Sequence, residues 1–195
     1  MDTNKAITTR RSIRRFKQET ISKNILMKLM EAARVAPSAM NAQPLKYLVI
    51  DDKSLLLKVF ETLSWAGYIA PHGTPPEGQK PVAYIIVLLD DSLKNDYFKY
   101  DIGAAVENIL LSATDQGLGS CWVGSVNRNV LQKSLAIPNS YYIDSVIALG
   151  YPDQGSQVEE LKDSIKYWRD DNGDMHIPKR ALKEIMYYNV IARSS

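Results

Sequence analysis

The chain has 195 residues, of which 45% are hydrophobic and 24% charged, and this composition fits one globular domain and excludes wholesale disorder. Its 24 basic and 22 acidic side chains leave a net charge of only +2, so no global field attracts it to nucleic acid or to an anionic membrane. It has no apolar run of 18 residues, and its first ten residues are too polar for a signal peptide, so we expect a cytoplasmic protein without a membrane-spanning helix.

The beginning of the chain predicts two capped helices. Asp2 and Thr3 can cap a helix that runs to Thr9. Ser22 can cap a second helix, whose apolar residues recur at helical spacing until Pro37 stops it. Beyond it we expect a strand, a helix and a long irregular loop rich in glycine and proline, over residues 44–51, 54–63 and 64–80.

The middle of the chain predicts the centre of the fold. Residues 81–89 are almost continuously apolar, as in a strand buried on both faces. Residues 95–116 carry an apolar stripe at helical spacing, and Gly117 and Gly119 can end that helix. Further elements are expected as a strand over 120–126, a helix over 129–136, a strand over 143–149 and a turn at 170–173. The sum is an α+β domain in which helices flank a sheet.

The sequence offers few side chains for metal or thiol chemistry. Cys121 is the only cysteine, and His72 and His176 are the only histidines, so no zinc-ligand spacing can be assembled. Cys121 lies in an apolar stretch, where a buried bystander is favoured over a catalytic thiol. We expect no metal site.

The first candidate ligand-binding segment is strongly basic. Residues 10–15 read Arg-Arg-Ser-Ile-Arg-Arg; guanidinium groups pair bidentately with phosphate, and the Ser12 hydroxyl adds a donor. The alternative is a solvated basic surface or a nucleic-acid patch. A nucleic-acid module is disfavoured, because binders of single strands also place exposed aromatics beside their basic residues, and only Phe16 is close.

A second candidate segment is the small and polar stretch of residues 37–44. Its small residues let a ligand approach the backbone, and Ser38, Asn41 and Gln43 offer the donors and acceptors that the edge of a heterocycle requires. The alternative is an ordinary connecting loop.

The third candidate segment, residues 117–125, is rich in glycine. A Gly-x-Gly-x-x-Gly match fails at Trp122, and these glycines follow a helix where that motif must follow a strand, so a Rossmann fold is rejected. Gly124 and Ser125 remain candidates for backbone donors to a ligand. No hydrolase, Walker or zinc-protease motif is present, and a cofactor is therefore the natural carrier of any reaction.

Taken in order, five segments resemble the nitroreductase family of flavoproteins, and the resemblance covers nearly the whole chain. The segments are residues 10–16, 36–44, 101–105, 117–124 and 178–180. The resemblance implies an α+β fold with a central mixed β-sheet flanked by helices, and one FMN-binding domain over residues 1–195. It further implies an interlocked homodimer that holds FMN in two interfacial pockets.

The resemblance also assigns residues to the FMN site. One chain would supply Arg10, Arg11, Ser12 and Arg14, with Lys179 and Arg180 at the phosphate, and its partner would supply Pro37, Ser38, Met40, Asn41 and Gln43. Gly124 and Ser125 would lie against the reactive middle of the flavin ring. Trp65 and Tyr68 are expected to line or cover the substrate site, with core packing as the alternative.

By the same resemblance, the chain is expected to be an FMN-dependent oxidoreductase. It would transfer two electrons from NADH or NADPH to a nitroaromatic, a quinone or a similar small electrophile by a ping-pong mechanism. Arg14 near the N1–O2 edge would favour the reduced flavin anion, and a backbone N–H near Gly124 would hydrogen-bond N5, so that no side chain is needed as acid or base. The alternatives are other flavin chemistry on the same fold, dehalogenation or flavin fragmentation, and a non-catalytic FMN-binding or sensory protein.

Overall fold

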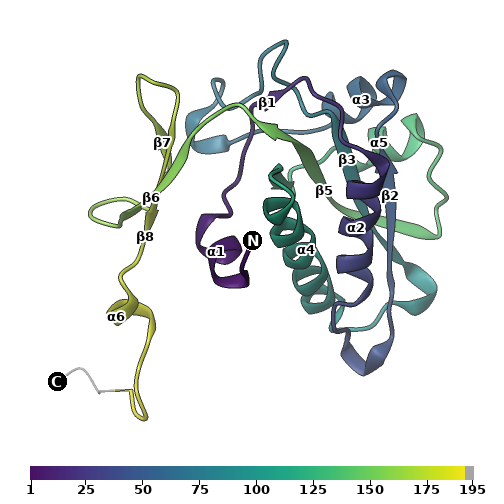
Figure 1. Ribbon diagram of the computed structural model, residues 1–195. Helices are drawn as coiled ribbons and strands as arrows, with labels where there is room; N and C mark the ends of the chain where they lie inside the picture. Colours follow the sequence, from purple (N-terminus) through teal and green to yellow (C-terminus); the bar gives the residue numbers. More distant parts are fainter. Residues whose placement is uncertain (192–195) are drawn as a thin grey trace. The chain divides into compact units, whose positions relative to one another are not determined.

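The computed structural model describes residues 1–191 and shows two compact units, Met1–Gln154 and the part that begins at Gly155. A five-stranded sheet forms the centre of the first unit, with the order β1-β5-β3-β2 and with β4 also paired to β5 (Figure 1). Its strands are β1 (Phe16–Lys17), β2 (Leu45–Ile50), β3 (Ala83–Asp90), β4 (Gly119–Val123) and β5 (Tyr141–Pro152).

The pairs of named strands in this sheet are all antiparallel. A parallel contact occurs as a single bridge between Ser12 and Ser120. The expected mixed sheet is therefore almost entirely antiparallel within the described residues, although the α+β class is confirmed. Strand β5 is longer than its apolar run of residues 143–149 because its far end also pairs with β1 and β4.

The helices of the first unit cover both faces of the sheet. They are α1 (Thr3–Thr9), α2 (Lys23–Arg34), α3 (Lys53–Phe60), α4 (Phe98–Asp115) and α5 (Arg128–Ser134), with short 3-10 helices η1 (Ala39–Asn41), η2 (Gly67–Ile69) and η3 (Asp91–Leu93). The predicted caps are present, since Asp2 accepts from the N–H groups of Asn4 and Lys5, and Ser22 accepts from that of Ile25. Gly117 follows α4 with a φ of 75°, as its predicted role at the helix end requires. The same expectation for Gly119 was wrong, because Gly119 begins β4.

Strand β3 divides the hydrophobic core into two layers. Successive side chains of a strand point to opposite faces, and here Tyr84, Ile86 and Leu88 join one buried cluster while Ile85 and Val87 join the other. Helices α2 and α4 pack on the second cluster, and α3 and α5 contribute to the first. The continuous apolar run predicted this double burial.

Two apolar residues anchor the basic segment to the sheet. The Ile13 N–H donates to the Ser120 carbonyl at 2.8 Å, and a Cβ on Gly119 would meet Ile13 at 2.8 Å. A Cβ on Gly150 would likewise meet Phe16 at 2.8 Å. The backbone of residues 12–16 therefore lies directly on β4 and β5, and the arginines between these anchors take fixed positions.

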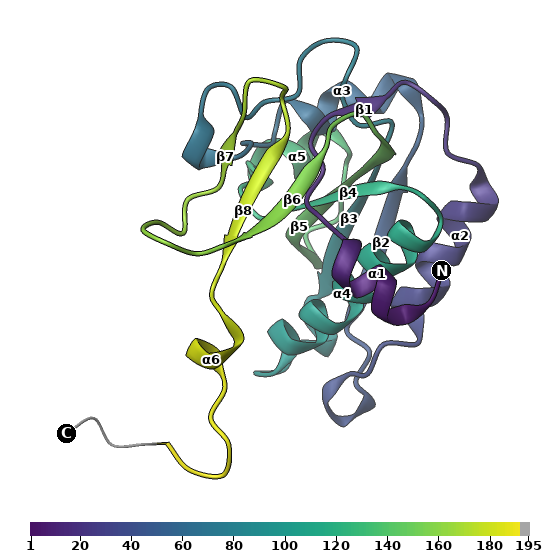
Figure 2. The ribbon, with the colours of Figure 1, turned by 60° about the vertical axis from the view of Figure 1, so that its left-hand side comes forward.

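The second unit contains a three-stranded sheet that the sequence analysis missed. Strand β8 (Met175–Lys179) lies between β6 (Ser156–Glu160), which is parallel to it, and β7 (Trp168–Arg169), which is antiparallel (Figure 2). A short helix, α6 (Leu182–Ile185), follows. No helix within residues 1–191 has the length and apolar character needed to cross a membrane. One FMN-binding domain over residues 1–195 stays a prediction.

Candidate functional site

The basic segment has more hydrogen-bond donors than the protein satisfies. Arg10 Nε lies 3.1 Å from Glu107 Oε1 on α4, and Arg11 Nη1 donates to the Arg10 carbonyl at 2.6 Å. Arg11 Nε and Arg15 Nε are buried and have no partner within the described residues. An unpaired buried donor costs about 1–3 kcal/mol, so this segment is built for an acceptor from outside the chain.

The electrostatics of Arg11 agree with this interpretation. Partial burial lowers the pKa of the Arg11 guanidinium, and the positive charge of Arg10 lowers it further. The segment therefore concentrates positive charge that an anionic ligand would relieve, as the phosphate prediction requires.

A pocket at the end of β4, here called the β4 pocket, brings three of the predicted FMN-binding residues together. Arg14, Gly124 and Ser125 all line it, together with residues 64–67 and 121–123. Neither the Gly124 N–H nor the Ser125 N–H has a hydrogen-bond acceptor within the described chain. A Cβ on Gly124 would meet nothing within 4 Å, so a flat ligand has room beside this backbone.

The two loops that form the β4 pocket are fixed to each other. The Ser64 N–H donates to the Ser125 carbonyl at 3.0 Å, and the Asn127 N–H donates to the Thr62 carbonyl at 2.8 Å. Between these bonds, Leu63 and Val126 form an antiparallel bridge. The free N–H groups therefore lie on an ordered loop, as a binding site requires.

The two aromatic residues predicted near the substrate site differ in their surroundings. Trp65 is buried, packs against Phe60 with ring centroids 5.7 Å apart, and lines the β4 pocket, and its Nε1 has no partner among the residues that the structure describes. Tyr68 is exposed and is not among the residues that line this pocket. Trp122 does line it and is 42% exposed, a contribution that the sequence analysis missed.

Cys121 also lines the β4 pocket but is unsuited to nucleophilic chemistry. Burial raises the pKa of its thiol, and the nearby Arg14 guanidinium only partly offsets this effect. The thiol is therefore protonated at neutral pH.

A second pocket, here called the α2/β2 pocket, contains part of the other predicted group. Pro37, Ser38 and Gln43 line it, with residues of α2, α4 and β2 around them. Asp101 on α4 also lines it, is 3% exposed, and accepts the Ala39 N–H at 2.8 Å through Oδ1. Its Oδ2 has no partner among the described residues, so one buried acceptor remains for a ligand.

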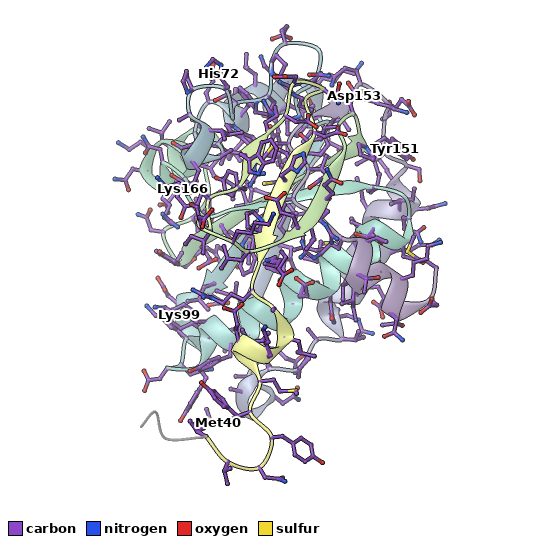
Figure 3. The ribbon with its side chains drawn as sticks, turned by 90° about the vertical axis from the view of Figure 1, so that its left-hand side faces the viewer. Met40, His72, Lys99, Tyr151, Asp153 and Lys166 are labelled. Carbon is purple, nitrogen blue, oxygen red and sulfur yellow. The ribbon has the colours of Figure 1, made fainter. Side chains whose placement is uncertain are left out.

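The loop over residues 38–43 is strained in a way that a connecting loop does not need. Met40, Asn41 and Gln43 have φ values of 54°, 53° and 49°. A left-handed conformation costs a residue other than glycine about 1–2 kcal/mol, so the surroundings must enforce it. The Ser38 hydroxyl does so in part by accepting the Gln43 N–H at 3.1 Å, and Met40 is left 79% exposed on the surface (Figure 3).

The two pockets have no lining residue in common. Arg14, predicted to come from one chain, lines the β4 pocket with Gly124 and Ser125. Three residues predicted to come from the partner line the α2/β2 pocket: Pro37, Ser38 and Gln43. The other predicted residues of the two loops line neither pocket: Arg10, Arg11, Ser12, Met40 and Asn41. Lys179 ends β8 and Arg180 follows it, both exposed in the second unit. Their part in the site, and the assignment of the whole set to FMN, stay predictions.

Known proteins share both the sequence and the fold. The family model described as "Nitroreductase family" matches residues 7–75 and 76–151. A protein of Archaeoglobus fulgidus with the provisional name NADH dehydrogenase/NAD(P)H nitroreductase is 36% identical over 166 residues, which cover 82% of this chain and 90% of that protein. An iodotyrosine deiodinase of Thermotoga neapolitana is 27% identical over 158 residues, 74% of this chain and 85% of that protein. A crystal structure of a provisionally named nitroreductase of Desulfovibrio desulfuricans in complex with FMN is 26% identical, with a TM-score of 0.74 over 98% of this chain and 99% of that one.

Proposed function

Because this chain belongs to the nitroreductase family of flavoprotein oxidoreductases, we propose that it binds FMN and transfers two electrons from NADH or NADPH to a small electrophile such as a nitroaromatic or a quinone. One observation carries the proposal: the β4 pocket combines Arg14 with the N–H groups of Gly124 and Ser125, which no acceptor within residues 1–191 satisfies. A cation and two free donors on one pocket wall are suited to a planar ring that becomes negatively charged.

The residues present fit FMN at both of its ends. The buried Nε atoms of Arg11 and Arg15 lack acceptors in the described part of the chain, which suits a group with several anionic oxygens. Arg14 lies at the β4 pocket, where its charge favours the reduced state of a bound flavin. When bound, FMN supplies the hydride and electron transfer.

The lining of the β4 pocket indicates that the protein positions groups and does not act as acid or base. Its described lining contains no carboxylate and no imidazole, and Cys121 is a protonated thiol. Trp65 and Trp122 present aromatic surface, against which planar reactants can pack. A single open pocket serves both reactants in turn, from which we expect ping-pong kinetics.

We further propose a homodimer that completes the site. The α2/β2 pocket, with Ser38, Gln43 and the unpaired Asp101 Oδ2, would belong to the second copy. The C-terminal arm of the described chain is rich in apolar side chains that are each more than half exposed: Leu182, Ile185, Met186, Tyr187, Tyr188, Val190 and Ile191. Such a concentration of exposed apolar surface favours association, and a sedimentation measurement that finds only monomers would contradict it.

Steady-state kinetics test the proposed reaction. The purified protein would be mixed anaerobically with NADH or NADPH and with a panel that contains a nitrobenzoate and a benzoquinone. We expect oxidation of the nicotinamide that requires the acceptor, with parallel double-reciprocal lines. If no acceptor supports oxidation of either nicotinamide, the oxidoreductase proposal fails.

The similarity to the iodotyrosine deiodinase supports a second candidate, reductive dehalogenation at the same pocket. Iodide release from a halogenated phenol, measured with dithionite as the reductant, separates the two. Fast iodide release with slow reduction of nitroaromatics favours dehalogenation, and the reverse pattern favours the first proposal.

A further inference from the structure

One arginine that the sequence analysis did not single out holds the loop of the β4 pocket. Arg128 begins α5, directly after residues 124–127. Its guanidinium donates to four backbone carbonyls: Nη2 to Asp144 at 2.5 Å and Gly124 at 3.2 Å, Nε to Ile143 at 2.8 Å, and Nη1 to Val126 at 3.4 Å. The loop is thereby tied to the edge of β5.

The charge of Arg128 is directed at this loop. No ion pair joins Arg128 to a carboxylate within residues 1–191. Besides its hydrogen bonds, the guanidinium makes one described cation–π contact, with the Tyr142 ring, whose centroid lies 5.8 Å from the guanidinium carbon. Its positive charge is thus balanced by carbonyl dipoles and not by an anion.

The hydrogen bond from Arg128 to the Gly124 carbonyl also affects the Ser125 N–H, the free donor of the β4 pocket, because both groups belong to one peptide. The Gly124 carbonyl and the Ser125 N–H belong to the same peptide plane, and Ser125 lines the β4 pocket without an acceptor for its N–H. A cation hydrogen-bonded to the carbonyl polarises that peptide and makes its N–H a stronger donor. It also fixes the direction in which the N–H points.

We propose that Arg128 is a positioning residue of the flavin site, which orients and polarises the Gly124–Ser125 peptide so that bound FMN is easier to reduce. This inference rests on the proposed function. A purely structural arginine would lower stability when replaced but would leave the flavin potential unchanged.

The experiment compares full-length wild-type protein with Arg128→Met, Arg128→Lys and Lys133→Met. Lys133 lies at the other end of α5, so its replacement removes the same charge from the same helix. The potential of bound FMN is measured by equilibration with a redox dye. For Arg128→Met we expect the Kd of reduced FMN, divided by that of oxidised FMN, to rise about tenfold, or about 30 mV for a two-electron couple. Arg128→Lys should lie between, and Lys133→Met should match the wild type.

The outcomes separate this inference from the proposed function. Failure of the wild type to bind FMN overturns both. A wild type that binds FMN, with Arg128→Met at the same potential, overturns the role of Arg128 alone. If Arg128→Met does not fold, Arg128→Gln, which keeps two donors without the charge, replaces it. Wild-type potential in both Arg128→Gln and Arg128→Lys would then overturn the inference.

Discussion

Two clusters of charge in this protein are built in opposite ways. In the basic segment, Arg11 Nε and Arg15 Nε are buried without an acceptor in the described chain. In the second unit, His176 lies between two carboxylates, with Nδ1 3.2 Å from Glu159 Oε2 and Nε2 3.3 Å from Asp170 Oδ2. Because each carboxylate faces a different ring nitrogen, only the doubly protonated ring can donate to both.

The His176 cluster is complete without a ligand. The Trp168 ring stacks on the imidazole with centroids 3.9 Å apart, and its Nε1 donates to Glu159 Oε1 at 2.9 Å. These contacts join β6, β7 and β8. A cluster with matched partners stabilises a sheet, whereas buried donors without partners indicate where a ligand belongs.

The largest expected effect comes from removing a cation of the incomplete cluster. Arg14→Ala should weaken FMN binding about 10- to 100-fold, because a hydrogen bond to a charged group contributes about 1.5–3 kcal/mol. The potential of any FMN still bound should also fall. Fluorescence titration with FMN measures the affinity.

The matched control for Arg14→Ala is Lys17→Ala. Lys17 is exposed on β1, three residues along the chain, and its replacement removes the same charge. It should change FMN affinity less than twofold. Equal losses in the two variants would reduce the role of Arg14 to general electrostatic attraction.

A smaller effect is expected at Asp101, where an acceptor is left over. Asp101→Ala should speed hydrogen exchange at the Ala39 amide and weaken FMN binding about 3- to 10-fold, since one hydrogen bond contributes about 1 kcal/mol. Asp101→Asn keeps an oxygen for the Ala39 N–H, so exchange at that amide should differ little from the wild type, but it replaces the left-over acceptor with a donor, so FMN binding should still weaken. Exchange followed by mass spectrometry decides, and unchanged exchange in Asp101→Ala would show that Asp101 does not hold the loop.

The smallest expected effect is a pH dependence of the stability that the His176 cluster contributes. Desolvation lowers the pKa of His176, but the hydrogen bonds and charges of Asp170 and Glu159 offset this effect, so the pKa is raised above its usual value near 6.5. The charges that face this cluster also include Lys162, close to Glu159. A raised folded pKa means that the stabilisation is fully present below about pH 6.5 and is lost as the pH rises through the folded value.

Amide exchange along β8, followed from pH 5.5 to 9 after correction for the intrinsic rate, tests this prediction. Protection should decline across that range in the wild type. His176→Phe keeps an aromatic ring on Trp168 and should show no such decline. A wild-type profile as flat as that of the variant would remove His176 from the stability of the sheet.

Much of the first unit could be predicted because its signals are local. The caps at Asp2 and Ser22, and the unbroken apolar run of β3, each act within a few residues. The second sheet could not be predicted, since β6 has Val158 as its one large apolar residue and β8 contains Pro178, which normally counts against a strand. Charged side chains around His176 pair across these strands, and such pairs recur at no fixed spacing in the sequence.

The candidate site likewise has a part that could be predicted from the sequence and a part that could not. Arg14, Gly124 and Ser125 could be expected together because they lie in recognisable segments, and the structure brings them to one pocket. Arg128 could not be found, because its partners are backbone carbonyls up to 16 residues away, which leave no mark in the sequence. Asp101 lay in a family segment, but its bond to Ala39 spans 62 residues.

Titration of the purified protein with FMN, followed by visible absorption and by chromatography of what heat releases, tests the central claim most directly. We expect a flavin spectrum and one FMN per chain, with binding that weakens as salt rises because basic side chains would hold the phosphate. A colourless protein that takes up no added FMN would contradict this expectation, and the buried Nε atoms of Arg11 and Arg15 would then need another acceptor.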